Sequence, residues 1–308
     1  MEPVVYIPNW NGGELLLQTL ASLSGEAQAR IVVVDNGSSD DSVARARNRF
    51  PGVECLEFGE NLGFGRALNR AVSELPGDPV IFLNNDVECE AGFLERMLGA
   101  ASQGAEMVAG VLVQADRPNL IDSAGVVVEG DTLLAFDYLH GESTDVLDKA
   151  PPPLAPCGGA ALFRRDAFES LGGFDERIFI YLEDVDLALR AAAAGMSCLL
   201  ARDARARHAY SSSLGSRSGA KYERTGWSRG YLLRRYGIAK RPAAARALLV
   251  EGAICAGQLV QHRTGKGVRG RIAGWHAGAD LPVRKLPATG LLDLSVRERL
   301  RWRANRRR

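Results

Sequence analysis

The first third of the chain alternates between short apolar runs and stretches with apolar residues at helical spacing. The runs predict strands over residues 4–7, 31–34, 53–58 and 80–83. The stretches after them predict helices over residues 14–23, 42–50, 63–73 and 92–101. Continuous β-branched runs indicate strands covered on both faces. We therefore predict an α/β fold with a doubly wound, mostly parallel sheet.

The rest of the chain is less regular. Residues 114–156 carry weak patterns and predict an irregular insertion near the functional site. Further on, the patterns predict a strand over 158–163, a helix over 166–171 with Asp166 as N-cap, a helix over 183–194 and a strand over 196–200. Beyond His208 the sequence is basic and largely helical. We predict an α/β domain over residues 1–212 and a basic, helical C-terminal region over residues 213–308.

Charge divides the chain into two unlike parts. The net charge is +1 overall, but residues 202–308 hold 25 Lys and Arg against 6 Asp and Glu, a net charge of +19. Residues 1–201 hold the remaining 13 Lys and Arg against 31 Asp and Glu, a net charge of −18. The basic part predicts an anionic partner, either a membrane surface or a nucleic acid. We expect the inner membrane surface and no nucleic acid, because the acidic part carries no nucleic-acid motif.

Cysteine usage and hydropathy bear on location. The five cysteines are odd in number and lack metal-type spacing, which predicts free thiols in a reducing compartment. No basic segment precedes the first strand and no run of 18 uncharged apolar residues occurs, so we expect neither a signal peptide nor a spanning helix. Together these features predict a cytoplasmic protein, peripheral on the inner face of the plasma membrane.

Polar residues stand just past the predicted strand ends, at Asn9, Asp35, Asn61 and Asp86. The carboxyl ends of parallel strands meet at one edge of a sheet, so we expect these side chains to converge. Residues 36–42 explain the polar turn after Asp35 without help from Asp35 itself. We therefore interpret Asp35 as a contact to the N3–H of a uracil or thymine ring, with a structural turn as the alternative.

Two further segments carry candidate ligand groups. Gly63 and Gly65 lie where a predicted helix begins, and free N–H groups there suit a phosphate or a ribose, with a plain helix cap as the alternative. Asn84, Asn85 and Asp86 follow a buried strand. A divalent cation on a diphosphate needs hard oxygen ligands such as Asp86, and the alternative is a strand-end turn.

Asp184 lies at the start of the helix predicted over residues 183–194. An accessible, ionised carboxylate there suits a general base that takes a proton from an attacking hydroxyl. The alternative is a charge pair with Glu183, stabilised by the helix dipole. Asp186 and Arg190, spaced i to i+4, predict an ordinary surface salt bridge.

Six segments in this order resemble a family 2 glycosyltransferase of the GT-A fold, over residues 3–212. They are Ile7-Pro8-Asn9-Trp10-Asn11, Val33-Val34-Asp35-Asn36-Gly37-Ser38, Asn61-Leu62-Gly63-Phe64, Leu83-Asn84-Asn85-Asp86, Gly172-Gly173-Phe174-Asp175-Glu176 and Glu183-Asp184-Val185-Asp186-Leu187. The resemblance implies an inverting transferase that uses a nucleoside-diphosphate sugar and Mg²⁺ or Mn²⁺, with residues 1–212 as its catalytic domain.

The resemblance also implies roles for single residues. Asp184 would be the general base, and Asp86 and His208 the protein ligands of the metal. The implied nucleotide-sugar-binding residues are Pro8, Asn9, Asn11, Asp35, Asn61, Gly63, Asn84, Asn85, Gly159 and Glu183. One departure matters, because the family motif Asp-x-Asp has Asn84 at its first position here. A neutral amide is a weaker ligand, so Asp86 and His208 are expected to hold the metal with the diphosphate.

Within the family, the Asn-Asn-Asp variant is similar to bacterial rhamnosyltransferases of cell-wall and O-antigen polysaccharide biosynthesis. This implies dTDP-L-rhamnose as donor and a polyprenyl-diphosphate-linked glycan as acceptor. One alternative keeps the fold and mechanism with a UDP-sugar carrying GlcNAc, galactose or glucose. A nucleotidyltransferase is a second alternative, but residues 7–12 lack its Gly-rich, basic first loop. A third is a catalytically inactive, membrane-associated scaffold.

The C-terminal region is consistent with a membrane role. Residues 244–262 carry an apolar stripe suited to a membrane interface or to the catalytic domain. Residues 297–308 add clustered arginines and Trp302. The alternative is a helix packed on the core with a disordered tail. We expect residues 114–156 and 213–308 to form the acceptor side.

Overall fold

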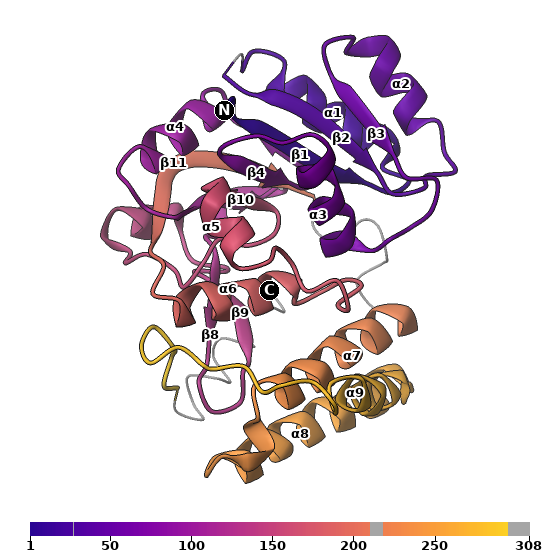
Figure 1. Cartoon of the computed structure of the whole chain (residues 1–308), viewed down its shortest axis with the longest axis vertical. Coiled ribbons are helices and arrows are strands. Elements are labelled where there is room, and N and C mark those ends of the chain that lie inside the picture. The colour runs from indigo at the N-terminus through magenta and orange to yellow at the C-terminus, as the bar shows by residue number, and fades with distance from the viewer. Residues whose placement is uncertain (27, 210–217, 295–308) are drawn as a thin grey trace.

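The computed structural model describes residues 1–26, 28–209 and 218–294. The strands are β1 (Val4–Asn9), β2 (Arg30–Asp35), β3 (Glu54–Glu57), β4 (Val80–Leu83), β5 (Val87–Cys89), β6 (Met107–Gln114), β7 (Arg117–Ser123), β8 (Val126–Val128), β9 (Ala135–Asp137), β10 (Ala160–Phe163) and β11 (Cys198–His208). Nine of them form one sheet of order β3-β2-β1-β4-β10-β6-β11-β5, with β7 beside β6 (Figure 1). β8 and β9 form a separate pair.

The helices of the described residues lie on both sides of this sheet and below it (Figure 1). They are α1 (Gly13–Leu23), α2 (Ser42–Arg49), α3 (Phe64–Glu74), α4 (Phe93–Ala101), α5 (Arg165–Ser170), α6 (Glu183–Ala193), α7 (Gly219–Arg235), α8 (Ala244–His262) and α9 (Lys266–Ala277). Two 3₁₀ helices, η1 (Thr144–Lys149) and η2 (Ile238–Lys240), complete the described elements.

The sheet begins as the sequence predicts. Strands β3, β2, β1 and β4 are parallel neighbours. A helix directly follows each of β1, β2 and β3, whereas the short strand β5 stands between β4 and α4. β10 then enters antiparallel to both β4 and β6, and β11 returns parallel to β6. The predicted α/β class, the mostly parallel sheet and the helical C-terminal region are confirmed.

Both faces of the central strands are buried, which explains their unbroken apolar sequence. Val5 and Ile7 of β1 belong to one core cluster, in which α1, α2 and α4 cover the sheet. Val4 and Tyr6 belong to a second cluster, in which α3, α5 and α6 cover the opposite face. All four side chains are fully buried. Successive side chains of a strand point to opposite faces of the sheet, and here both faces are buried. Apolar residues therefore follow one another without polar residues between them.

Three local predictions are wrong. Residues 114–156 are not an irregular insertion, because β7, β8, β9 and η1 lie within them. The N-cap of α5 is Arg164, and the Asp166 carboxylate pairs with that arginine at 2.8 Å. His208 ends β11, whereas the prediction placed it after a strand that stopped at residue 200. The longer strand matters because its far end carries the histidine into the sheet edge beside β5.

Two C-terminal helices are interlocked through glycines. A Cβ on Gly226 or Gly230 of α7 would overlap backbone atoms of α9. A Cβ on Gly270 or Gly274 of α9 would likewise overlap backbone atoms of α7. Small residues at such spacing allow two helix backbones to approach closely. The sequence therefore specifies α7 and α9 as a tightly packed pair.

A buried ion network connects the α7–α9 pair to α6, the helix whose second residue is the predicted base Asp184. Asp186 on α6 is fully buried and accepts hydrogen bonds from Arg190 Nε at 2.8 Å and Tyr236 Oη at 3.0 Å. It also pairs with Arg284, which follows α9 in the chain. The predicted surface salt bridge between Asp186 and Arg190 is thus wrong, because the pair is an interior contact.

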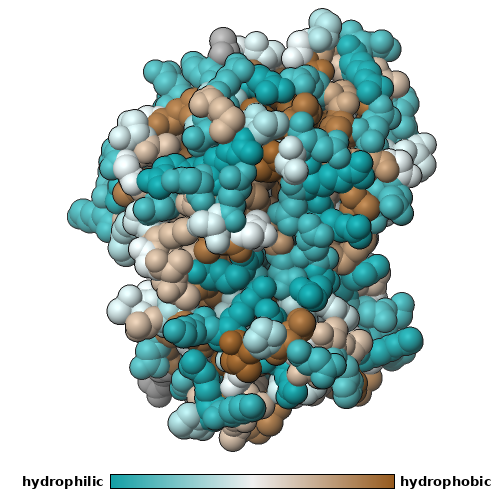
Figure 2. Space-filling model, viewed as in Figure 1, coloured by the Kyte–Doolittle hydropathy of each residue, from teal (hydrophilic) through white to brown (hydrophobic). Residues whose placement is uncertain are grey.

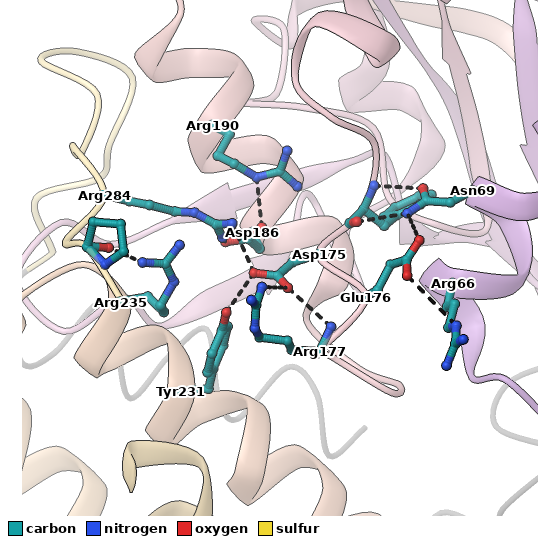
Figure 3. Close-up of polar contacts among 12 residues, drawn as sticks. Arg66, Asn69, Asp175, Glu176, Arg177, Asp186, Arg190, Tyr231, Arg235 and Arg284 are labelled. Carbon is teal, nitrogen blue, oxygen red and sulfur yellow. Dashed lines mark hydrogen bonds and ion pairs between the residues drawn. The ribbon is translucent and has the colours of Figure 1, made fainter. Parts of the chain in front are cut away.

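Asp175 is the second acid of the network. Its Oδ2 accepts hydrogen bonds from Tyr231 Oη on α7 at 2.7 Å and from Arg284 Nη2 at 2.9 Å. Figure 3 shows Arg284 reaching both Asp175 and Asp186. The C-terminal helices therefore support α6 directly. The predicted boundary at residues 212 and 213 falls outside the described residues and stays a prediction, as does the role of the tail over residues 297–308.

Candidate functional site

Three of the predicted residues converge where β1, β2 and β4 end. β1 and β2 pair in a register that places Asn9 opposite Asp35. Asn9 Nδ2 donates to Asp35 Oδ1 at 3.0 Å and to Ser42 Oγ at 3.0 Å. Asn85 Nδ2, just past β4, donates to Asn9 Oδ1 at 2.9 Å. Pro8 precedes Asn9 within β1 and pairs with β2 through its backbone register.

Asp35 has a structural task that the sequence did not reveal. It is buried, with 4% of its surface exposed, and its Oδ2 accepts the N–H of Ser38 at 3.1 Å. The inference that the turn needs no help from Asp35 is therefore wrong. Asn11 contributes to the same turn, because its Oδ1 accepts the N–H of Ser39 at 2.7 Å. The contact of Asp35 to a nucleobase stays a prediction.

Asn61 and Gly63 connect the end of β2 to the start of α3. Asn36 Nδ2 donates to Asn61 Oδ1 at 3.1 Å, and the N–H of Gly63 donates to the same oxygen at 3.0 Å. The N–H of Phe64 donates to the carbonyl of Phe179 at 2.7 Å. Two N–H groups at this helix start already have protein partners, which favours the helix-cap interpretation at Gly63.

Asp184 is held in place from both sides of its carboxylate. Its Oδ2 accepts the N–H of Gly158 at 3.1 Å and its Oδ1 accepts the N–H of Val185 at 2.8 Å. The next residue, Gly159, accepts the N–H of Asn84 through its carbonyl at 3.2 Å. A two-residue bridge thus joins the predicted base to the Asn84 strand end. A Cβ on Gly159 would lie 3.2 Å from the side-chain nitrogen Nδ2 of Asn84, so a larger residue here would press on the Asn84 side chain.

The backbone before α6 adopts an unusual conformation. Tyr181 and Leu182 both have positive φ values, of 70° and 66°. Non-glycine residues rarely adopt this region, and such strain clusters at functional sites. Burial raises the pKa of the half-buried Asp184, and the negative charge of Asp137 adds to the rise. A raised pKa brings a carboxylate closer to the range suited to a general base.

Glu183 differs from the charged helix-start residue that the sequence suggested. It is buried, with 6% of its surface exposed, and its Oε2 has no hydrogen-bond partner among the described residues. Burial, together with the neighbouring Asp184, raises the pKa of Glu183 to about 8. Glu183 is therefore a largely neutral acid at pH 7, so it stabilises the helix start little through the dipole.

We expect Glu183→Gln to flatten the pH dependence of stability. A pKa above the unfolded value means that the folded state holds the proton more tightly, so wild-type stability falls as pH rises from about 4.5 to about 8. For one such proton, the free energy of unfolding falls by up to about 1.4 kcal/mol per pH unit. The free energy of unfolding, measured with urea at pH 5 and pH 8, should fall less between these pH values for the variant than for the wild type. Parallel profiles would contradict the buried neutral acid.

Asp86 and His208 come together from the β4–β5 turn and the end of β11. His208 Nε2 lies 3.3 Å from Asp86 Oδ1. The backbone fixes this approach, because the carbonyl of Asp86 accepts the N–H of Ala209 at 2.9 Å. The other ring nitrogen, Nδ1, donates to Asp122 Oδ2 at 2.7 Å. Burial alone would lower the pKa of His208, but the hydrogen bonds to Asp122 and Asp86 outweigh it and raise the pKa to about 10.

These residues fit a divalent cation only in part. The described residues contain no group of three or more His, Cys, Asp or Glu side chains arranged to hold a metal ion. Asp86 and His208 supply one oxygen and one nitrogen donor, a pair that suits Mn²⁺ more closely than Mg²⁺. A cation bound here would need further ligands from a diphosphate.

Two residues of this site were missed by the sequence analysis, Asp122 and His140. Both lie in the stretch that lacked a clear pattern, and no motif marks either of them. His140 is one of only four histidines in the chain, which is the one signal that could have drawn attention to it.

Comparison with known proteins finds two matching family descriptions and several related sequences. The family described as "Glycosyl transferase family 2" matches residues 4–172, and "Glycosyl transferase family group 2" matches residues 122–260. An N-acetylglucosaminyl-diphospho-decaprenol L-rhamnosyltransferase of Mycobacterium tuberculosis is 34% identical over 218 residues, which cover 63% of this chain and 71% of that protein. A pre-mycofactocin glycosyltransferase of the same species is 30% identical over 203 residues and 39% of its length.

Two solved structures share the fold at low identity. The mannosyltransferase PcManGT from Pyrobaculum calidifontis, in complex with GDP-Man and Mn²⁺, has a TM-score of 0.53 and 18% identity, covering 90% of this chain and 85% of its own. S. aureus TarS 1–349 in complex with UDP-GlcNAc has a TM-score of 0.56 and 15% identity, covering 89% of this chain and 79% of its own. At these identities the likeness shows the GT-A fold alone.

Proposed function

Because the chain belongs to glycosyl transferase family 2 and is a glycosyltransferase, we propose that it transfers L-rhamnose from dTDP-rhamnose to a lipid-linked precursor of a cell-surface polysaccharide. The M. tuberculosis relative supports the sugar and the acceptor class, because its name gives a rhamnosyl group and a diphospho-decaprenol-linked acceptor. A UDP-hexose donor with the same mechanism is the alternative.

The observation that carries the mechanism is the placement of Asp184. Its carboxylate is oriented by Gly158 and joined through Gly159 to the Asn84 strand end. In the proposed inverting step, the acceptor hydroxyl oxygen forms a bond to the anomeric carbon while the bond from that carbon to the diphosphate oxygen breaks. The hydroxyl proton passes to Asp184, and the bonding electron pair leaves with the nucleoside diphosphate.

The remaining predicted residues are proposed to hold the donor. Asp86 and His208 would hold a divalent cation, which when bound neutralises charge on the departing diphosphate. Asp35 would contact the nucleobase, and Asn9 and Asn85 keep its carboxylate and the strand ends in register. Asn11, Asn61 and Gly63 line the turn and helix start beside it and complete the proposed nucleotide-sugar site with Pro8, Asn84, Gly159 and Glu183.

We also propose that α8 docks on the inner membrane surface. One face of α8 exposes only apolar and small residues over its whole length, namely Ala245, Leu248, Leu249, Gly252, Ala253, Ala256, Leu259 and Val260. Leu249 and Val260 are the most exposed, at 75% and 78%, and lie eleven residues apart, about three helical turns. The face viewed in Figure 2 also shows hydrophobic residues among polar ones over the C-terminal helices. An exposed apolar face of this extent is typical of an interaction surface.

The charges around α8 favour a lipid surface over a protein partner. Exposed cations flank the apolar face, with Arg241 before the helix and Arg263, Lys266 and Arg269 after it. Apolar residues bordered by cations match the boundary between acyl chains and anionic headgroups. Within the described residues, no helix is long and apolar enough to cross a membrane. The other side of α8 faces the protein, where Ala247 and Glu251 are buried.

We expect a variant with serine at Leu248, Leu249, Leu259 and Val260 to bind vesicles of phosphatidylglycerol and phosphatidylcholine at least tenfold more weakly. Each side chain loses on the order of 1 kcal/mol of apolar burial in the lipid. Vesicle sedimentation measures the change, with Val146→Ser, at an exposed position of another element, as the control. Equal binding by both variants would argue against α8 as the docking surface.

The proposed reaction is tested by nucleoside-diphosphate release from dTDP-rhamnose, UDP-GlcNAc, UDP-galactose and UDP-glucose. Each donor is combined with a bacterial polyprenyl-lipid extract, with Mn²⁺ or with a chelator. Release from dTDP-rhamnose alone, dependent on lipid and metal, is expected. Release from a UDP-sugar would keep the mechanism and replace the sugar. Nucleotide binding without release from any donor would support the inactive scaffold.

A further inference from the structure

The region over residues 114–156 contributes two buried side chains to the neighbourhood of the proposed metal ligands. Asp122 lies on β7, and His140 follows β9. The backbone sets them side by side, because Ile121 donates its N–H to Glu142 and accepts the N–H of Gly141 at 2.8 Å. The folding of this region thereby places His140 opposite Asp122.

Asp122 lies between two histidines. His208 Nδ1 donates to Asp122 Oδ2 at 2.7 Å, and His140 Nδ1 donates to the Asp122 carbonyl oxygen at 2.7 Å and lies 3.4 Å from Asp122 Oδ1. The side chain of Asp122 is 7% exposed, and those of His140 and His208 are 15% and 14% exposed. The three side chains therefore form a compact, mostly buried row that ends at Asp86.

This row fixes the orientation of the His208 ring. Because a carboxylate only accepts hydrogen bonds, the proton on this side of the ring must be on Nδ1. Nε2 is then the nitrogen that faces Asp86, at 3.3 Å from its Oδ1. A histidine whose Nδ1 donates to a carboxylate has its ring plane set for ligation, and a cation at Nε2 would replace the second proton of the ring. His140 in turn restrains Asp122, because its Nδ1 donates to the Asp122 backbone carbonyl and lies within ion-pair distance of the second carboxylate oxygen, Oδ1.

We propose that Asp122, restrained by His140, is a positioning residue that aims His208 Nε2 at a divalent cation shared with Asp86. The inference rests on the proposed function, since it assigns the support of the metal ligands in that site. It also changes the role of residues 114–156. The sequence placed them with the acceptor, whereas the Asp122–His140 pair assigns part of this region to the donor side of the reaction.

The test is Mn²⁺ binding by Asp122→Asn in the presence of dTDP or UDP, followed by the loss of the free-ion paramagnetic resonance signal. The amide keeps the shape of the side chain but removes its charge and can turn an N–H toward the ring. We expect Mn²⁺ affinity to fall about 10–100-fold, the usual effect of losing such a partner. Affinity for dTDP in the presence of a chelator should not change, because no cation takes part.

Two further variants make the result specific. Asp175→Asn removes a carboxylate that is equally buried but pairs with Tyr231 and Arg284, so it should lower stability and leave Mn²⁺ affinity unchanged. His140→Gln should weaken Mn²⁺ binding less than Asp122→Asn, and it provides the measurement if the latter does not fold. Wild-type affinity in Asp122→Asn, or in His140→Gln when it is the only folded variant, would overturn the positioning role alone. Absence of Mn²⁺ binding by the wild type with either nucleotide would overturn the metal site together with its support.

Discussion

Replacing Asp184 by Asn should lower kcat for sugar transfer about 10²–10⁴-fold, the usual contribution of a positioned general base. The amide has nearly the shape of the carboxylate and can still accept the N–H of Gly158 through its oxygen. It cannot take the proton of an acceptor hydroxyl. Nucleotide-sugar affinity, measured by calorimetry, should stay near the wild-type value because the amide keeps the shape of the side chain and most of the proposed donor-binding residues lie on other elements. Nucleoside-diphosphate release with saturating acceptor measures the loss.

The matched control is Asp203→Asn, which removes the same charge from an exposed position on β11. It should transfer sugar at the wild-type rate. Near-normal transfer by Asp184→Asn would refute its role as base. A parallel loss of donor binding would instead indicate that Asp184 shapes the donor site.

Replacing Asp186 by Ala should destabilise the protein by about 3–5 kcal/mol, because the change leaves buried charges without their partner. Asp186 has no exposed surface and bonds to Arg190 and Tyr236 while pairing with Arg284. Its removal also breaks one of the connections between α6 and the C-terminal helices. Urea unfolding at pH 7, with the free energy extrapolated to water, measures the change.

The control for this variant is Asp166→Ala on α5. Asp166 also pairs with an arginine at 2.8 Å, but the side chains of Asp166 and Arg164 are 70% and 43% exposed. An exposed pair contributes about 0–1 kcal/mol, so this variant should be close to the wild type. Similar small losses in both variants would mean that the Asp186 network is not buried in solution.

Much of the α/β framework could be predicted from residues that are close together in the sequence. Val4 to Ile7 and Val80 to Leu83 are unbroken apolar runs, and each forms the strand predicted for it. The same holds for α6, whose acidic start and alanine-rich end lie within a few residues of one another. The polar residues at the strand ends were also predictable, because the carboxyl ends of parallel strands meet at one edge. Of the four residues expected to converge, Asn9 and Asp35 are hydrogen-bonded to each other there, and Asn85, which was not among the four, joins them. Asn61 bonds to Asn36 and Asp86 lies beside His208.

The contacts that support the site were not predictable in the same way. Asp186 and Arg190 fit the spacing of a surface pair, and only the placement of Arg284 over α6 shows that the pair is interior. Glu183 is interpreted from the sequence as a helix-start charge, yet burial and the neighbouring Asp184 raise its pKa to about 8. Both errors have one cause, since exposure depends on what packs against a residue and not on its neighbours in the chain.

The sequence by itself determined the central strands, the helices between them, the family and the positions of Asp86 and Asp184. Each follows from residues that are close together in the chain, where hydrophobic period, turn chemistry and motif spacing act. The tertiary structure alone decided which distant groups meet these residues. Asp122 lies 86 residues before His208, and Arg284 lies 98 residues after Asp186. Such pairs are selected by packing of the whole chain, because burial makes an unpaired charge costly wherever its partner lies in the sequence.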